Sequence, residues 1–220
     1  MVSISLIIVN YNTKEYLSRC VKSIYESGIS LDGLQLIILD NSSQDSSLKR
    51  TQDFIDKKSL KAEIICNSEN LGFSKAVNIG LKKCVGDYIC ILNPDTYIEK
   101  LCLVKLEEYM TQNSDIGCIT PKLVNSNGLL QISCKRSLPT IKNSFFKILG
   151  LDKVFKNSRT MSSYNLLYLD EDEINQVEVI SGAFMFLRKE VVHKVGYFDE
   201  TFYLYGEDID YCHRIRKEGF

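Results

Sequence analysis

Carboxylate side chains follow within three residues of the end of two of the apolar runs in this sequence. Asp95 comes after the run 88–92, and Asp40 comes after the run 34–39. Hard cations such as Mg²⁺ and Mn²⁺ prefer carboxylate, water and phosphate oxygens, so one carboxylate suffices when a diphosphate supplies further ligands. We therefore predict a nucleotide site in which Asp95 holds a divalent metal against a diphosphate. In this hypothesis Asp40 accepts hydrogen bonds from a base or a ribose, and Tyr11 stacks on the base.

These residues need a scaffold that brings several strand ends together. The apolar runs alternate with stretches of helical periodicity. Strands are expected over 3–9, 34–39, 62–66, 88–92 and 116–120, and helices over 14–25, 44–55, 74–83 and 101–110. This alternation predicts an α/β fold with right-handed βαβ units and a mostly parallel central sheet flanked by helices. Because parallel strands share one carboxyl edge, we expect the polar residues after the first four strands to lie together there.

The alternative is that these polar residues only make turns. Asn, Asp, Ser and Gly are ordinary residues of turns and helix N-caps. That explanation is sufficient for any one loop. It is weaker for four loops that meet at one edge of a sheet.

The composition of the chain narrows the classes of protein. Its 220 residues suit one large domain or two small ones, and a formal net charge of −1 argues against a globally basic protein, so no nucleic-acid partner is predicted. Eight cysteines without a C-x-x-C pair, with only two histidines, argue against a zinc site. We interpret Cys66, Cys90 and Cys118 as small core residues in a reduced, cytoplasmic setting.

Four common signals are missing from the sequence. No P-loop is present, and no G-x-G-x-x-G follows the first predicted strand, which removes the main signal of a dinucleotide-binding dehydrogenase. The apolar N-terminus lacks a basic region, so we interpret it as a strand rather than a signal peptide. No stretch approaches the roughly 18 to 20 apolar residues of a membrane span.

The pattern changes after about residue 125. Strands are expected over 177–180 and 183–187, and a helix over 207–217. The segment 135–159 holds seven basic residues and one acidic residue, Asp152, interleaved with apolar residues. It is either a solvated helix with one face in the core or an amphipathic surface that makes peripheral contact with anionic lipid.

Five stretches of the chain together resemble the family 2 glycosyltransferases with the GT-A fold. They are VSISLIIVNYN, LIILDNSSQD, NSENLGFSKAVNIG, ICILNPDT and ISGAFMFLRKEVVHKVGYFDETFYLYGEDIDYCHRIRKEGF. Each stretch alone is a modest signal, but their order and spacing are highly specific, and the match covers essentially the whole chain. The chain is most similar to the bacterial rhamnosyltransferase-like members.

The resemblance implies one GT-A-like domain over 1–220, with a nucleotide-sugar-binding half over 1–125 and a smaller acceptor-binding half over 126–220. It also assigns roles to the matching residues of the first half. These are Asn10, Tyr11 and Asn12 in the first loop at the nucleoside, Asp40 at the base or ribose, Gly72 and Asn78 lining the nucleotide pocket, and Asn93 and Asp95 at the place of the D-x-D motif. Since Asn93 replaces the first Asp of that motif, metal binding is assigned chiefly to Asp95.

The second half carries the remaining residues implied by the resemblance. Glu207 and Asp208 match the acidic pair before the last helix and are the implied catalytic residues, with Asp208 as the general base. Ser181 and Gly182 either contact the donor sugar or acceptor, or belong to a core strand in which Gly182 permits close packing. Asp210 is expected to pair with an arginine. The alternative for the acidic residues is the helix macrodipole, which favours them in a first turn by about 0.3–1 kcal/mol.

The implied activity is inverting transfer of a sugar from a nucleotide diphosphate to a hydroxyl, assisted by Mn²⁺ or Mg²⁺. The first expected donor is dTDP-rhamnose, followed by UDP-sugars, and the expected acceptor is a saccharide or a lipid-linked carbohydrate of cell-envelope polysaccharide biosynthesis. The expected location is cytoplasmic, with peripheral contact at the inner membrane face through 135–159. Relatives usually continue past the final helix, so a truncated C-terminus is expected.

Two other functions compete with this one. A nucleotidyltransferase also uses an α/β sheet and a metal-bound nucleotide, but its Gly-rich basic first loop is replaced here by NYN. A non-catalytic nucleotide- or carbohydrate-binding module is the other alternative. The GED sequence at 206–208 argues against that module.

Overall fold

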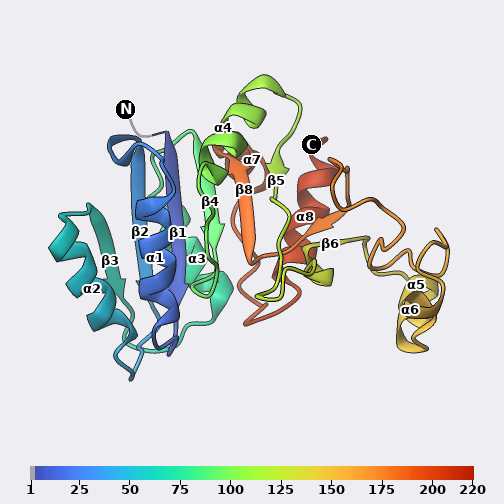
Figure 1. Cartoon of the computed structure of the whole chain (residues 1–220), viewed down its shortest axis with the longest axis horizontal. Coiled ribbons are helices and arrows are strands. Elements are labelled where there is room, and N and C mark those ends of the chain that lie inside the picture. Colours follow the sequence, from blue (N-terminus) through green and yellow to red (C-terminus); the bar gives the residue numbers. More distant parts are fainter. Residues whose placement is uncertain (1–2) are drawn as a thin grey trace.

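The centre of the fold is a six-stranded sheet with helices packed on both faces (Figure 1). The computed structural model describes residues 3–220. The strand order is β3-β2-β1-β4-β8-β5. These strands span Ile4–Asn10 (β1), Leu34–Asp40 (β2), Ala62–Cys66 (β3), Tyr88–Leu92 (β4), Cys118–Ile119 (β5) and Phe184–Arg188 (β8). The predicted α/β class with a mostly parallel, helix-flanked sheet is confirmed.

Six helices cover the sheet in two layers. They span Tyr16–Glu26 (α1), Ser47–Lys58 (α2), Phe73–Leu81 (α3), Cys102–Gln112 (α4), Lys189–Val195 (α7) and Glu207–Lys217 (α8). Helices α1, α2 and α4 supply side chains to the core on one face, and α3, α7 and α8 supply side chains to the core on the other. The bounds of α7 are not predicted from the sequence, although a helix is expected at His193, which lies within it.

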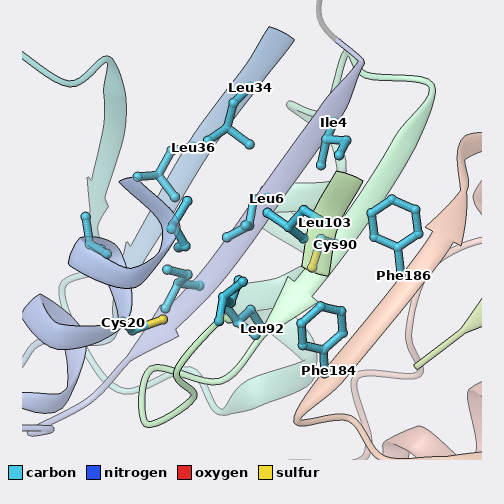
Figure 2. Packing of buried hydrophobic residues seen from close by; sticks show 14 of the residues in the cluster. Ile4, Leu6, Cys20, Leu34, Leu36, Cys90, Leu92, Leu103, Phe184 and Phe186 are labelled. Atoms are coloured by element: carbon cyan, nitrogen blue, oxygen red, sulfur yellow. The ribbon is translucent and has the colours of Figure 1, made fainter. Parts of the chain in front are cut away.

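Alternate residues of β1 enter these two cores. Ile4 and Leu6 pack on the face shown in Figure 2, with Cys90 of β4 and Phe186 of β8. Ile7 and Val9, which alternate with these residues along the strand, pack on the opposite face. All seven residues of β1 are buried, as expected for a parallel strand that is covered on both sides.

The carboxyl ends of β1 to β4 meet at one edge of the sheet, which we call the rim. These four strands are parallel, and their register places Asn10 beside Asp40 and Asp40 beside Cys66. On the other side of β1, Ile8 pairs with Leu92. The prediction that four strand ends share an edge is confirmed.

Strand β8 departs from the repeated βαβ pattern. It runs antiparallel to β4 on one side and to β5 on the other, so β5 is separated from β4. The strand predicted over 116–120 is reduced to two residues. Because β8 is antiparallel, its first residue, Phe184, lies opposite Leu92 at the rim. The residues just before β8 therefore join the ends of the parallel strands.

The segment between β5 and β8 forms small elements beside the main sheet. Strands β6 (Lys135–Arg136) and β7 (Val179–Ile180) pair antiparallel in a second sheet. Helices α5 (Ile141–Ile148) and α6 (Leu151–Val154) lie at the end of the molecule that is away from α2 and β3 (Figure 1). Two short 3₁₀ turns, η1 and η2, span Leu31–Gly33 and Ile132–Cys134.

The structure corrects part of the cysteine interpretation. Cys90 is buried, but Cys66 is exposed and Cys118 is only partly buried. Cys66 ends β3, which is an edge strand of the sheet and is therefore covered less than a central strand. Separately, none of the helices in residues 3–220 combines the length and the apolar character that crossing a bilayer requires.

Candidate active site

Asn10 and Asp40 form the centre of a hydrogen-bonded network at the rim. The Asn10 amide donates to Asp40 Oδ1 at 2.6 Å and to the hydroxyls of Ser43 and Ser47 at 3.0 Å each. Asp40 also accepts the Ser43 backbone N–H at 3.0 Å and the Ser43 hydroxyl at 2.7 Å. Both Asn10 and Asp40 are buried. The structure thus brings these two predicted residues together, where they hold the loop after β2.

Tyr11 and Asn12 lie above this network. The Asn12 backbone N–H donates to the Ser43 hydroxyl at 3.0 Å, and the Asn12 side-chain oxygen accepts the Gln44 backbone N–H at 2.8 Å. Asn12 has a φ of 53°, a left-handed conformation that Asn adopts more readily than most residues. Tyr11 is 47% exposed, which leaves its ring accessible for stacking on a base.

Three further asparagines, which follow β2 and β3 and to which the sequence analysis gives no individual role, extend the rim. The buried Asn41 amide donates to Asn70 Oδ1 at 3.2 Å and to the Gly72 carbonyl at 3.1 Å, and Asn41 Oδ1 accepts from Asn67 Nδ2 at 2.8 Å. The backbone N–H of Gly72 donates to Asn70 Oδ1 at 3.0 Å. The concentration of Asn after two neighbouring strands, in DNSS and CNSEN, is the signal that identifies these residues.

Gly72 brings the start of α3 against the loop 196–206. Its φ is 81°, and a Cβ at this position would lie 2.7 Å from the carbonyl oxygen and the ring of Tyr203. The backbone N–H of Phe73 donates to the same Tyr203 carbonyl at 2.8 Å. Only glycine accommodates this conformation and this contact together. Gly72 therefore allows the two halves of the chain to meet at the rim.

Asn78 connects α3 to the same loop from a buried position. Its Nδ2 donates to the Phe198 carbonyl at 2.9 Å and to Glu200 Oε1 at 3.0 Å, and its Oδ1 accepts the Phe198 N–H at 2.9 Å. The side chain is 3% exposed, and these contacts use its polar atoms within the protein. A direct contact between Asn78 and a nucleotide stays a prediction.

Asp95 lies in the turn after β4, and its side chain is exposed. The backbone N–H of Asn93 donates to the Ala183 carbonyl at 2.9 Å, and the Asn93 carbonyl accepts the Thr96 N–H at 3.2 Å. These bonds fix the turn that carries Asp95 next to the start of β8. The carboxylate of Asp95 forms no ion pair with a basic residue in the described part of the chain.

The residues at the rim fit a cation that is held largely by its substrate. Within residues 3–220, no group of three or more His, Cys, Asp or Glu side chains could hold a metal ion by itself. Asp95 presents one uncommitted carboxylate at the rim, and Mg²⁺ is usually bound through one or two carboxylates plus substrate phosphates. The predicted role of Asp95 is therefore chemically consistent with its position.

Asp208 lies in the first turn of α8 and accepts hydrogen bonds from three donors. Arg136 Nη2 donates to Asp208 Oδ2 at 2.5 Å, the Gly182 N–H donates to the same oxygen at 3.1 Å, and the Ile209 N–H donates to Oδ1 at 2.8 Å. The Asp208 and Arg136 side chains are 13% and 14% exposed. Arg136 is a site residue that the sequence analysis missed, because no local pattern connects residues so far apart in the chain.

Glu207 is buried beside Asp208, and its Oε2 has no hydrogen-bond partner in the described structure. Burial raises the pKa of Glu207, the charge of Asp208 raises it further, and Arg136 partly opposes this. Gly182 faces both carboxyl groups, since a Cβ there would lie 3.4 Å from Asp208 Cβ and 3.6 Å from Glu207 Oε1. The predicted acidic pair thus consists of an ion-paired Asp208 and a buried Glu207 with a raised pKa.

Two neighbours of this cluster are tied to local structure. The Ser181 hydroxyl accepts the Ala183 N–H at 3.2 Å, and the residue is 8% exposed. Asp210 Oδ2 accepts from Arg214 Nε at 2.8 Å, which confirms the predicted pairing of Asp210 with an arginine. A direct contact between Ser181 and a sugar stays a prediction.

Asp95 and Asp208 lie at the same edge of the sheet. Strand β4 ends opposite the start of β8, and the Asn93 N–H bonds to the Ala183 carbonyl. The next residue back along the chain, Gly182, donates its N–H to Asp208. This short series of contacts places the candidate metal ligand and the candidate base around one rim.

A cavity of about 510 Å³ adjoins Asp208 through Arg136, which is one of its lining residues. The other lining residues belong to the second half of the chain or its border. They are Asn125, Leu129, Leu130, Ile132, Ser133, Lys147 and Asn165. The cavity is therefore separate from the hydrogen-bonded network around Asn10 and Asp40.

The sheet topology, the rim of Asn and Asp residues and the second carboxylate next to β8 are the features expected of a GT-A domain. Residues 5–196 match the model of glycosyl transferase family 2. The chain therefore belongs to that family.

Two curated relatives illustrate the similarity in sequence. The chain is 26% identical to the low-salt glycan biosynthesis hexosyltransferase Agl10 of Haloferax volcanii, over 98% of this chain and 62% of that protein. It is also 26% identical to the poly(ribitol-phosphate) beta-N-acetylglucosaminyltransferase TarS of Staphylococcus aureus, over 78% of this chain and 30% of that protein. The chain thus spans less than two thirds of the length of these relatives.

Solved structures show the same fold at low sequence identity. The mannosyltransferase PcManGT from Pyrobaculum calidifontis, in complex with GDP-Man and Mn²⁺, has a TM-score of 0.68 at 16% identity, covering 99% of this chain and 52% of that one. S. aureus TarS 1-349 in complex with UDP-GlcNAc has a TM-score of 0.65 at 18% identity, covering 97% of this chain and 53% of that one. These likenesses confirm the predicted GT-A fold.

The family match decides between some of the sequence-based hypotheses. It confirms a glycosyltransferase of family 2 and favours it over the nucleotidyltransferase alternative. The rhamnosyltransferase-like subclass stays a prediction, since the relatives named above are a hexosyltransferase and an N-acetylglucosaminyltransferase.

Proposed function

We propose that this domain transfers a sugar from a nucleotide diphosphate to a hydroxyl group, with inversion at the anomeric carbon and with Asp208 as the general base. One observation carries the proposal. Asp95, exposed after β4, and Asp208, held at the start of α8, are linked around one rim by the contacts of Asn93 with Ala183 and of Gly182 with Asp208. An inverting displacement needs one group that stabilises the leaving diphosphate, here through a metal ion, and a second group that takes the proton from the attacking hydroxyl.

The donor nucleotide binds at the ends of β1 to β3. Tyr11 stacks on the base, and Asn12 lies beside it in the same loop. Within residues 3–220, Asp40 Oδ2 accepts only the Ser43 N–H, so it retains a lone pair for a base or ribose group. The bonds among Asn10, Asp40 and Ser43 hold these loops in place before the nucleotide arrives, which lowers the ordering cost of binding.

Asp208 is oriented to take a proton from the acceptor. As the acceptor oxygen forms its bond to the anomeric carbon, the bond from that carbon to the diphosphate breaks, and its electron pair leaves with the diphosphate. The hydroxyl proton passes to Asp208. Among the described residues, Asp208 Oδ1 accepts only the Ile209 N–H, so it has a lone pair free, while Arg136 and Gly182 hold Oδ2.

Glu207 has a different part in this scheme. Its buried carboxyl, with a raised pKa, lies behind Asp208 and next to Gly182. We assign it a positioning role for the start of α8. Asp208, which is less buried and ion-paired, remains the group that meets the acceptor.

Asp95 would hold the divalent cation, Mn²⁺ or Mg²⁺, with the diphosphate supplying further oxygens. When bound, such a cation offsets the negative charge that develops on the leaving diphosphate. The structural neighbour PcManGT contains Mn²⁺ together with GDP-Man, which supports the same cofactor for this chain.

The relatives support a hexose-type donor and a glycan acceptor. Their names describe a hexosyltransferase of glycan biosynthesis and a transferase that acts on poly(ribitol-phosphate). We propose UDP-sugars and dTDP-rhamnose as the donors to test, and a saccharide or lipid-linked acceptor that enters the cavity at Arg136. The cavity supports this because Arg136 joins it to Asp208.

Calorimetry with UDP and with dTDP, each with and without Mn²⁺, tests the donor site. We expect Mn²⁺ to strengthen nucleotide binding to the unaltered chain. Asp95→Ala should remove this metal dependence and leave the weaker metal-free binding unchanged. Thermal stabilisation by a panel of sugar nucleotides with Mn²⁺ then identifies the donor, because a ligand of the native state raises its melting temperature.

The matched control is Asp115→Ala, which removes another exposed carboxylate beyond the end of α4. It should behave like the unaltered chain in both measurements. If Asp95→Ala retains full Mn²⁺ dependence, the assignment of the metal ligand is wrong. If neither nucleotide binds with or without Mn²⁺, the proposed donor class is wrong.

A further inference from the structure

We propose that α5 and α6 dock onto an anionic lipid bilayer and present a membrane-borne acceptor to the cavity at Arg136. The proposal rests on the function proposed above and deepens it, because it names the partner from which the acceptor comes. We call this region the α5–α6 surface. It comprises the exposed apolar residues Ile141, Phe145, Ile148, Leu149, Val154 and Phe155 and the exposed basic residues Lys142, Lys147, Lys153, Lys156 and Arg159.

Helix α5 turns its apolar side outward. Ile141 is 94% exposed, Ile148 is 83% exposed, and Phe145 and Leu149 are each 56% exposed. The spacing of these four residues, at i, i+4, i+7 and i+8, places them on one side of a helix. A helix that belongs to a core buries such a stripe. Here the stripe has no partner among residues 3–220 that covers it.

A buried polar residue fixes the inward side of the same segment. Asn143 is 6% exposed, and its Nδ2 donates to the Ser137 hydroxyl at 3.0 Å and to the Leu138 carbonyl at 2.9 Å. Asn143 also completes a capping box with Thr140 at the start of α5. These bonds fix which side of α5 faces the protein. These hydrogen bonds therefore hold α5 in the orientation that turns its apolar stripe toward solvent.

The charges on this surface all have one sign. Asp152 is the one acidic residue between 141 and 159, and it is 2% exposed and accepts from Asn165 Nδ2 at 2.8 Å. The basic residues around the stripe are exposed. Exposed apolar residues surrounded by Lys and Arg are typical of a segment that lies in the interface of an anionic bilayer.

The acidic run at 170–173 does not cancel this charge. Two of its members, Glu171 and Asp172, form ion pairs with Lys122 at 2.9 and 2.8 Å. Lys122 belongs to the segment after β5 and not to the α5–α6 surface. Within residues 3–220, no ion pair joins a basic residue of the α5–α6 surface to an acidic side chain, so these charges are available to an external anion.

The α5–α6 surface borders the proposed acceptor cavity. Lys147 of α5 lines that cavity together with Arg136, and Arg136 contacts Asp208. In Figure 1, α5 and α6 lie at the end of the molecule beyond β6, away from the strands that carry the nucleotide loops. An acceptor whose lipid part stays in the bilayer can thus place its head group beside Arg136.

A second copy of the chain is a less suitable occupant. A symmetric pair would bring the same surface of two copies together. The exposed lysines of one copy would then face those of the other, and like charges placed opposite each other disfavour association. An anionic bilayer satisfies both the apolar stripe and the basic ring.

Co-sedimentation with vesicles tests the proposal on the 220-residue chain. We expect binding to vesicles of phosphatidylcholine mixed with phosphatidylglycerol, weaker binding to phosphatidylcholine alone, and a loss of binding as salt is raised. The double variant Phe145→Ser/Ile148→Ser should lower the partition coefficient by about tenfold or more. Lys142→Glu/Lys153→Glu should abolish the preference for phosphatidylglycerol.

The matched control is Val85→Ser, which removes an apolar side chain that is 57% exposed in the loop before β4. It should leave vesicle binding unchanged. The proposal is overturned if the unaltered chain binds neither vesicle, if Val85→Ser weakens binding as much as the double variant, or if sedimentation velocity shows that Phe145 and Ile148 mediate self-association instead. Nucleotide binding, measured on the same samples, should be equal in all variants, so a failure here is distinct from a failure of the proposed donor site.

Discussion

The two halves of the chain place polar and apolar residues in opposite ways. In residues 1–125, the proposed nucleotide half, helices bury their apolar sides, and polar groups gather where strands end, so that strand register alone brings Asn10 to Asp40. In the acceptor half, α5 buries Asn143 and exposes Ile148. There the candidate base, Asp208, is held by a residue from a distant segment rather than by a neighbouring strand.

This difference indicates which features of the site depend on regular structure. Any parallel sheet with these loop residues brings the strand ends to one rim, so the position of the proposed donor site follows from topology. The proposed acceptor site depends on irregular segments and on one long-range ion pair, between Arg136 and Asp208. We infer that the acceptor half can change its specificity without rebuilding the sheet, because loops tolerate substitution better than core strands do.

The largest effect on activity should come from Asp208→Asn, which should stop sugar transfer and leave nucleotide binding intact. The amide cannot accept the acceptor proton, so transfer should fall by about 10²- to 10⁴-fold. Nucleotide binding should be retained, because the nucleotide half supplies those contacts. Release of the nucleoside diphosphate measures transfer, and calorimetry measures binding.

The control for this variant is Asp210→Asn, which alters an acidic residue of the same helix that pairs with Arg214. It should transfer sugar at a rate near that of the unaltered chain. Equal rates for Asp208→Asn and the unaltered chain would contradict the base assignment. Loss of nucleotide binding in Asp208→Asn would show that the two halves are not separable.

A smaller effect is expected for Gly72→Ala, at the point where the halves touch. The new Cβ would lie 2.7 Å from Tyr203, in a backbone conformation with a φ of 81°. Strain and overpacking together should lower the free energy of unfolding by about 2–4 kcal/mol. Urea denaturation measures this loss.

Gly128→Ala separates the two causes. Gly128 has a φ of 77°, but a Cβ at that position would have no other atom of the described residues within 4 Å. The substitution should cost only the backbone strain, about 1 kcal/mol. If both variants lose the same stability, the contact between Gly72 and Tyr203 contributes nothing.

The smallest effect on the free energy of unfolding is expected for Glu207→Gln, and its size depends on pH. Burial raises the pKa of Glu207 in the folded chain above its value in the unfolded chain, so the folded state keeps the proton to a higher pH. The unaltered chain therefore loses stability as pH rises between those two values, and the Gln variant, which cannot ionise, does not. Urea denaturation at several pH values should show the variant to be the more stable of the two above this window. At each pH, the difference in unfolding free energy between the variant and the unaltered chain is measured. If this difference moves against the variant from acid to neutral pH, the explanation from the raised pKa of Glu207 is wrong.

Much of the nucleotide half is predictable because its signals are local. The strands over 62–66 and 88–92 begin and end where the sequence predicts, as does the helix over 207–217 in the other half. The shared rim follows from strand direction. What the sequence could not show is the position of a strand within the sheet, which is why Cys66, on the edge strand β3, was wrongly expected in the core.

The acceptor half is less predictable because its decisive contacts are not local. Helical periodicity identifies the apolar side of α5, but it cannot show whether that side faces the protein or the solvent. Arg136 lies within a run of basic residues, and only the tertiary fold singles it out as the partner of Asp208. Helix α7 follows β8 directly, without a turn residue that marks the change.

The insertion of β8 between β4 and β5 has a consequence for how the protein is made. A ribosome must release the chain through Arg188 before the central sheet can close, although β1 to β4 emerge much earlier. During that interval β4 has an unpaired edge, which is a hazard for aggregation. The nascent chain also forms the loops after β1 to β4 before it possesses Asp208, so the proposed base is added only after β8 has covered the exposed edge of β4.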